Sequence, residues 1–110
     1  MPVQSPAEFI EKILPERLSD REKLKGIAVT LQFDISGEAG GKWVLSIADQ
    51  KAEIREGCID DPRITLKMKD TDYVSLVNGD ISGQKAFMTG KLRFKGDMNT
   101  GMKLQRLGII

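Results

Sequence analysis

Hydrophobic residues in the first part of the chain recur at helical spacing. Ser5 can cap a helix, Pro6 suits its first position, and Glu8 lies where a capping box needs an acid. The apolar stripe that follows consists of Phe9, Ile10, Ile13 and Leu14. Pro15 should stop or kink this helix, because proline removes a backbone donor.

The charged stretch 16–25 predicts a second helix or a turn, with Leu18 and Leu24 as apolar anchors. From Gly26 the period changes to two, which indicates half-buried strands. Alternating apolar and polar residues predict four strands, at 29–35, 43–47, 52–55 and 64–68.

Two short helices and a fifth strand are predicted after these four strands. Asp70-Thr71-Asp72 can cap a helix that ends near Asn78-Gly79, and a second helix begins at Ser82 or Gly83 and is closed by Gly90. Leu92 and Phe94 alternate with basic residues in a fifth strand. Gly96-Asp97 then leads into a last helix.

The order of these elements predicts an α+β fold for a single domain, residues 1–110. We expect one five-stranded sheet, mostly antiparallel, with helices on one face. Short turns make the first three strands an antiparallel meander. Helices separate the fourth strand from the fifth, so that pair could be parallel and linked by a right-handed crossover.

Composition excludes several kinds of catalytic site. The chain has no histidine and one cysteine, Cys58. Ser-His and Cys-His nucleophilic catalysis, His-ligated zinc and an internal disulfide are therefore ruled out. The chain offers no convincing active site, and we predict no catalytic residue, no metal, no cofactor and no enzyme activity.

The charge is almost balanced overall, with 17 basic and 16 acidic residues, but it is unevenly distributed. Residues 84–110 hold six basic side chains and one acid, Asp97. A basic end can orient a protein toward an anionic surface or head group. It can also be an ordinary solvated face of the fold.

Other candidate sites have simpler structural explanations. The densest acids, which are Asp60, Asp61, Asp70 and Asp72, fall in a turn and at a helix start. The glycines between 37 and 41 fit a hairpin loop better than a phosphate loop, since no helix follows them. Lys91, Arg93 and Lys95 share one strand face from which Phe94 points away, so no stacking platform for nucleic acid is predicted.

Methionine is concentrated in the C-terminal half, at Met68, Met88, Met98 and Met102. Its soft, flexible side chain fills irregular cores and suits adaptable apolar sites. Composition alone leaves both interpretations open.

Three runs of residues resemble the sterol carrier protein type 2 domain family. They are Thr65-x-Lys67-Met68-x-Asp70-x-Asp72-Tyr73 with Asn78-Gly79 after it, then Ala86-Phe87-Met88-x-Gly90-Lys91-Leu92-x-x-x-Gly96-Asp97-Met98, and Met102-Lys103-Leu104-Gln105. The strand that holds Trp43 and the N-terminal helix also fit in order and spacing, so the resemblance covers nearly the whole chain. It implies helices that enclose an apolar tunnel, and non-catalytic binding and transfer of fatty acids, acyl-CoA esters, phospholipids or sterols.

The resemblance also implies ligand-binding residues at matching positions, namely Trp43, Leu76, Gln84, Phe87, Met88, Met102 and Gln105. Apolar members would enclose the lipid, and Gln84 and Gln105 could place amide groups at a polar end. The implied partners are a hydrophobic lipid and, through Lys91, Arg93, Lys95 and Lys103, transient contact with an anionic membrane. The alternative is an interaction module of the same fold, with a filled core and no lipid cargo.

The ends of the chain lead to an expectation about location. The N-terminus lacks the features of a signal peptide, and Leu107-Gly108-Ile109-Ile110 is not a peroxisomal address. We therefore expect a cytoplasmic location and consider the peroxisome less favoured.

Overall fold

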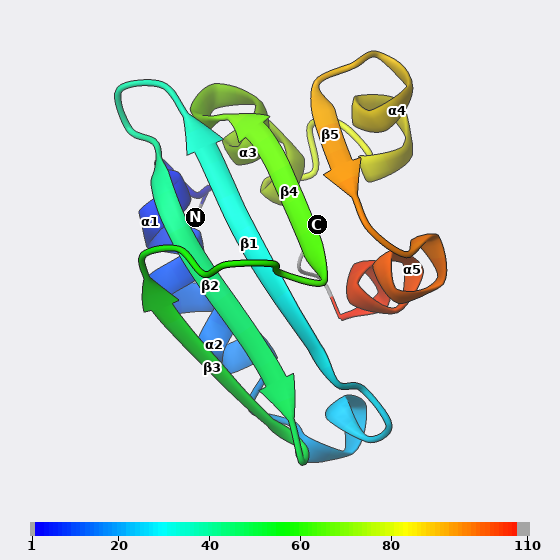
Figure 1. Cartoon of the computed structure of the whole chain (residues 1–110). Helices are drawn as coiled ribbons and strands as arrows, with labels where there is room; N and C mark the ends of the chain where they lie inside the picture. Colours follow the sequence, from blue (N-terminus) through cyan, green and yellow to red (C-terminus); the bar gives the residue numbers. More distant parts are fainter. Residues whose placement is uncertain (1, 108–110) are drawn as a thin grey trace.

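The computed structural model describes residues 2–107 and shows a five-stranded mixed sheet with helices on one face (Figure 1). The predicted α+β class is confirmed. Strand order across the sheet is β3-β2-β1-β4-β5. The strands are β1 (Val29–Ser36), β2 (Gly41–Ala48), β3 (Lys51–Glu56), β4 (Ile64–Lys69) and β5 (Leu92–Lys95). The helices are α1 (Pro6–Glu8), η1 (Phe9–Ile13), α2 (Leu14–Arg17), η2 (Arg21–Leu24), α3 (Asp70–Val77), α4 (Gly83–Met88) and α5 (Met98–Arg106).

One parallel pair is present, but it is not the pair expected from the sequence. β4 pairs in parallel with β1, whereas β4 and β5 are antiparallel. The prediction for β4 and β5 was wrong because α3 and α4 together bring the chain back to the end of the sheet where β4 finishes (Figure 1). The crossover instead joins β3 to β4, and it is a loop without a helix that passes over the open face of the sheet.

The N-terminal helix begins as predicted and does not stop at Pro15. The Ser5 hydroxyl accepts a hydrogen bond from the Glu8 N–H at 3.2 Å. The helix runs on to Arg17 through η1, a π-helical segment in which the Leu14 N–H donates to the Phe9 carbonyl five residues back. This wider register lies directly before the proline, where the ordinary helical ladder would lose a donor.

The core lies between the sheet and α1, α2 and α3, which pack behind it in Figure 1. Tyr73 is fully buried at its centre, with its ring edge-on to Phe9 and to Phe33 at 6.0 Å each. Burial raises the pKa of the Tyr73 hydroxyl well above its usual value. Leu18 and Leu24 are buried as predicted and belong to the same core.

On the opposite face of the sheet, a buried glutamine on β1 makes hydrogen bonds to β2 and to the β3–β4 loop. The Gln32 side-chain Nε2 lies 3.1 Å from the carbonyl oxygens of Phe33, Trp43 and Gly57, and its Oε1 accepts from the Ile59 N–H at 3.0 Å. These bonds attach the start of the β3–β4 loop to the sheet. One amide side chain thus connects β1, β2 and the loop that leads toward β4.

Asp70 makes a second long-range connection, between the β1–β2 hairpin and α3. Its carboxylate accepts hydrogen bonds from the Ala39 N–H at 3.0 Å and the Thr71 N–H at 2.8 Å. These two backbone donors hold the pKa of the Asp70 carboxyl below its usual value. Gly37 must lack a side chain here, since a Cβ at that position would overlap the carboxylate and its φ is +102°.

We predict that Gln32→Ala lowers the free energy of unfolding by about 3 kcal/mol, because it leaves several buried backbone groups without a partner. Thr30→Val is the matched control, since it removes one hydrogen bond, from the exposed Arg63 N–H, on the same face of β1. Its cost should stay below about 1 kcal/mol. Urea unfolding followed by circular dichroism measures both, and equal effects would contradict this role of Gln32.

Candidate functional site

A groove of about 390 Å³ lies between α4, β5 and α5, at the edge of the sheet. Its walls are mainly apolar side chains and bare glycine backbone. The lining residues are Gly83, Gln84, Phe87, Leu92, Phe94, Met98, Gly101, Met102 and Gln105. The groove is open to solvent, and the structure does not show an enclosed tunnel.

Local sequence signals position the helix on one side of the groove. Ser82 caps α4 by accepting from the Lys85 N–H at 3.1 Å. The helix ends at Met88, and the φ of +80° at Gly90 lets the chain turn so that the Lys91 N–H donates to the Ala86 carbonyl at 2.9 Å. The buried Ala86 holds α4 against the core.

The second helical wall, α5, is capped by Asp97. Its carboxylate accepts from the Thr100 hydroxyl at 2.8 Å and the Asn99 N–H at 3.2 Å. These bonds hold the pKa of the Asp97 carboxyl below its usual value, with the Thr100 hydroxyl as the main cause. The cap fixes where the helix begins, and so it places Met98 and Met102, four residues apart, on the groove side.

Glycine allows α5 to approach the sheet. A Cβ at Gly101 would lie 2.7 Å from the Phe94 ring, so the ring packs against bare helix backbone. Across the groove mouth, a Cβ at Gly83 would lie 3.4 Å from the Gln105 side-chain nitrogen, which is ordinary contact. α4 and α5 are therefore near each other at Gly83 and Gln105, and α5 and β5 at Gly101 and Phe94.

Large apolar side chains are left in solvent around this groove. Phe87 is 48 % exposed, Met98 58 %, Met102 55 % and Met88 76 %. Exposed apolar residues gathered at one site indicate a binding surface, whereas isolated ones do not. The polar side chains of the lining are those of Gln84 and Gln105, and none of the lining residues is charged.

Four of the seven predicted ligand-binding residues come together in the groove, namely Gln84, Phe87, Met102 and Gln105. Met88 lies on the same helix but outside the lining. Trp43 and Leu76 are buried in the core and do not line the groove. The Trp43 indole Nε1 is buried there with no hydrogen-bond partner. The roles of all seven as ligand contacts stay predictions.

Sequence reasoning did not include Leu92, Phe94, Met98 and Gly101 among the site residues, although they line the groove. A signal was available for three of them. Leu92 and Phe94 alternate with the basic residues of β5, and Met98 precedes Met102 by one helical turn. The role of Gly101 depends on how closely α5 approaches the sheet, which spacing alone does not reveal.

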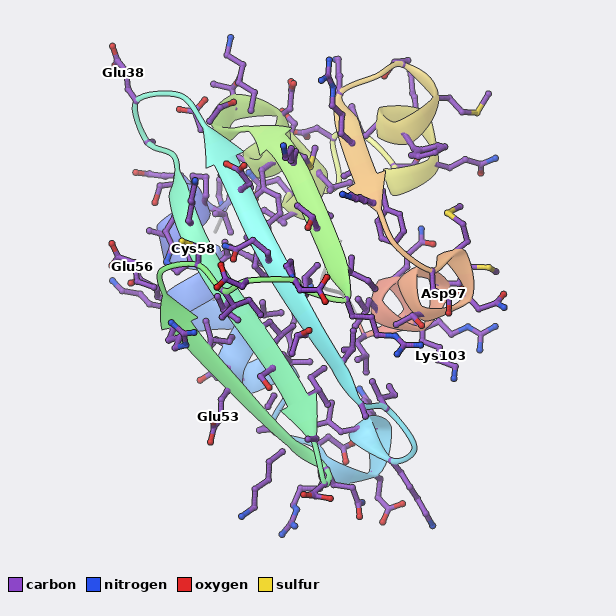
Figure 2. The ribbon with its side chains drawn as sticks, viewed as in Figure 1. Glu38, Glu53, Glu56, Cys58, Asp97 and Lys103 are labelled. Carbon is purple, nitrogen blue, oxygen red and sulfur yellow. The ribbon has the colours of Figure 1, made fainter. Side chains whose placement is uncertain are left out.

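The predicted basic cluster is divided between two surfaces. Lys91 and Arg93 lie with Lys67 and Lys69 in a separate hollow on the outer face of β4 and β5, which also contains Asp34 and Asp72. Lys103 is on α5, and Figure 2 shows it pointing away from the sheet. The basic residues of this end therefore do not form one continuous patch.

The described residues offer little for catalysis or metal binding. Within residues 2–107, no group of three or more Cys, Asp or Glu side chains is placed to hold a metal ion. None of the helices described is long and apolar enough to cross a membrane. The features that stand out chemically are the apolar groove and its two amide groups.

Comparison with known proteins identifies a single family, which matches nearly the whole chain. The model of the SCP-2 sterol transfer family matches residues 10–108. Sterol carrier protein 2 of Gallus gallus is 35% identical over 101 residues, covering 89% of this chain and 18% of that protein. Hydroxysteroid dehydrogenase-like protein 2 of Bos taurus is 34% identical over 97 residues, covering 87% of this chain and 23% of that protein. The chain thus spans less than a quarter of these curated relatives.

Solved structures share the fold over most of their length. The sterol carrier protein domain 2 of Helicoverpa armigera is 26% identical with a TM-score of 0.77, covering 98% of this chain and 91% of that one. The palmitated SCP2L2 of Aedes aegypti is 20% identical with a TM-score of 0.75, covering 96% of this chain and 95% of that one.

We predict that Gly101→Ala lowers the free energy of unfolding by about 1–3 kcal/mol, because the new methyl group collides with the Phe94 ring. Gly83→Ala, the matched change in α4, should stay within about 0.5 kcal/mol of the parent. Adding Phe94→Leu to Gly101→Ala should recover part of the loss. Thermal unfolding compares the three variants, and equal stability of the two alanine variants would contradict the close contact.

Proposed function

We propose that this chain, which belongs to the SCP-2 sterol transfer family, binds a single-chain acyl lipid in the groove between α4, β5 and α5 and carries it without altering it. Membership of this family supports lipid binding in general. The acyl class of the cargo and its place in this groove are our proposal. The observation that carries it is the apolar groove flanked by exposed Phe87, Met98 and Met102.

The size of the groove favours a chain over a bulky ring system. A methylene group fills about as much space as a water molecule, ~30 Å³, so about 390 Å³ accommodates roughly a dozen methylenes. Each buried methylene contributes about 0.8 kcal/mol, offset by the cost of ordering the ligand. A palmitated relative of the same fold from Aedes aegypti is consistent with an acyl cargo.

The lining favours a ligand whose groove-facing part is uncharged. Gln84 on α4 and Gln105 on α5 are the polar side chains of the lining, and both are exposed. Their amides can hydrogen-bond a carboxyl, ester or hydroxyl group and so orient the lipid, as a few polar groups do in apolar sites. Met98 and Met102 can adapt to chains of different length, since methionine is flexible.

We further propose that the domain acts without catalysis, as a carrier, and as part of a larger protein in those relatives that extend well beyond it. A reducing, cytoplasmic setting would suit the exposed free thiol of Cys58. Lys91, Arg93, Lys95 and Lys103 would attract anionic membranes or head groups, and this attraction should weaken as salt rises. The alternative is an interaction module of the same fold with a filled core and no lipid cargo, which would use the same exposed apolar walls to bind a partner.

A fluorescent fatty-acid titration tests this proposal. The parent protein should show saturable binding at micromolar concentration, and Met102→Glu should weaken it at least tenfold, because a carboxylate next to an acyl chain loses hydration. Asn99→Glu is the matched control, since it places the same charge on the exposed side of α5 away from the groove. Its affinity should match that of the parent. The proposal fails if the parent shows no saturable binding, or if both variants bind as the parent does.

A further inference from the structure

We propose that the outer face of β4 and β5 holds an anion site for a small molecule that carries two neighbouring phosphate groups, such as a diphosphate ester. The site is the hollow of about 410 Å³ that contains Lys67, Lys69, Lys91 and Arg93. It shares no lining residue with the groove, because alternate residues of β5 face the two cavities. The inference therefore goes beyond the proposed function and does not depend on it.

The strand register places these four cations next to one another on one face of the sheet. Arg93 on β5 is directly opposite Lys67 on β4. Lys69 follows Lys67 by two residues, so it points to the same face one step along the strand. Lys91 precedes Arg93 by the same spacing, and it lines the same hollow. The four charges form two neighbouring rows across β4 and β5.

The opposed pair of Lys67 and Arg93 is unfavourable for folding on its own. Like charges directly opposite each other destabilise an antiparallel pair of strands. Asp34 lies in the same row on β1, but it is opposite Lys67 on one side and Lys42 on the other. One carboxylate thus stands between two lysines, and Arg93 at the end of the row has no acid opposite it in the register.

The next row and the rest of the hollow do not restore the balance of charge. Lys69 is opposite Ser36 on β1, which carries no charge. Asp72, in the first turn of α3, is the second acid of the hollow beside Asp34. Both acids are half-buried, whereas the four basic side chains are exposed and can turn toward a bound anion. Four basic and two acidic side chains leave an excess of two positive charges.

This excess of positive charge belongs to one edge of the sheet. At the other edge, the outward residues of β3 alternate in sign, as Lys51, Glu53 and Arg55. The β3–β4 loop crosses β2 and β1 and joins β4 at its start, so it leaves β5 and the end of β4 uncovered (Figure 1). The hollow is therefore open to a ligand from solution.

The spacing of the cations favours a ligand with two phosphate groups over a single small anion. Opposed residues are about 5 Å apart across a pair of strands, and same-face residues are about 7 Å apart along a strand. One anionic group can bridge Lys67 and Arg93, and a second one can bridge Lys69 and Lys91. Arginine binds phosphate oxygens through two parallel hydrogen bonds, and lysine contributes point charges. Such a ligand would relieve the repulsion between the cations, so its binding should stabilise the fold.

Two-dimensional NMR of the isotope-labelled chain tests the location of the site. Inorganic diphosphate should shift the backbone amide signals of Lys67, Lys69, Lys91 and Arg93 until they saturate, and leave that of Met102 in the groove unmoved. ADP and inositol trisphosphate then separate a nucleotide from a lipid head group, and the larger saturable shift identifies the source of the phosphates. Absence of saturable shifts at these four residues with all three probes would overturn the inference.

Thermal unfolding distinguishes a bound ligand from general screening. In low-salt buffer, millimolar diphosphate should raise the midpoint by at least about 2 °C more than sodium chloride of equal ionic strength does. Arg93→Gln should raise the midpoint in the absence of added anion, since it removes one of two opposed cations, and should lose at least about half of the response to diphosphate. Arg93→Lys, which keeps the charge, should keep most of that response.

Arg55→Gln is the matched control, since it makes the same change on the same face at the opposite edge of the sheet. It should respond to diphosphate as the parent does. Equal effects of diphosphate and sodium chloride on the parent, or equal losses of response in Arg93→Gln and Arg55→Gln, would overturn the site.

The two proposals fail separately. Arg93 does not line the groove, so fatty-acid titration of Arg93→Gln should match the parent. Saturable fatty-acid binding without a specific response to diphosphate would overturn the anion site alone. Diphosphate binding at the hollow without saturable fatty-acid binding would overturn the proposed function alone.

Discussion

The contact between the Phe94 ring and the bare backbone of Gly101 is the constraint on which the proposed site depends. It sets how far α5 stands from β5, and thereby the width of the groove. β5 has four residues, and its Leu92 and Phe94 line the groove beside α4 and α5. A short edge strand with two separate helices beside it leaves apolar surface that residues 2–107 do not bury. In a protein of this size, such surface calls for a ligand or a partner.

The other elements of the fold position β5 at this edge of the sheet. Gln32 secures the loop that crosses the open face, and this loop delivers β4 beside β1 rather than beside β3. α3 and α4 then return the chain so that β5 runs antiparallel to β4 at the sheet edge. Tyr73, packed edge-on between Phe9 and Phe33, fills the core under the other strands. The main core is closed by these rings, while the β5 end remains open.

The periodicity of apolar residues was enough to predict the five strands, the helix starts at Ser5 and Ser82, and the α+β class. It was not enough for the position of β4, because the pairing of β4 with β1 rests on contacts between residues far apart in the sequence, which a local pattern does not contain. The expectation that the helix stops at Pro15 was also wrong, because a π-helical segment directly before the proline lets the helix continue. Of the site residues, Phe87 and Met102 were found through family resemblance. Gly101 was missed, because its importance lies in a distance between elements that no local pattern records.

The central claim is that the groove between α4, β5 and α5 holds a lipid, and native mass spectrometry of freshly purified protein tests it most directly. We predict a population heavier than the bare chain by the mass of one acyl lipid, which activation in the gas phase releases. Added long-chain fatty acid should convert the remaining bare protein to a one-to-one complex. Detection of the bare chain alone, both before and after fatty acid is added, would contradict the account.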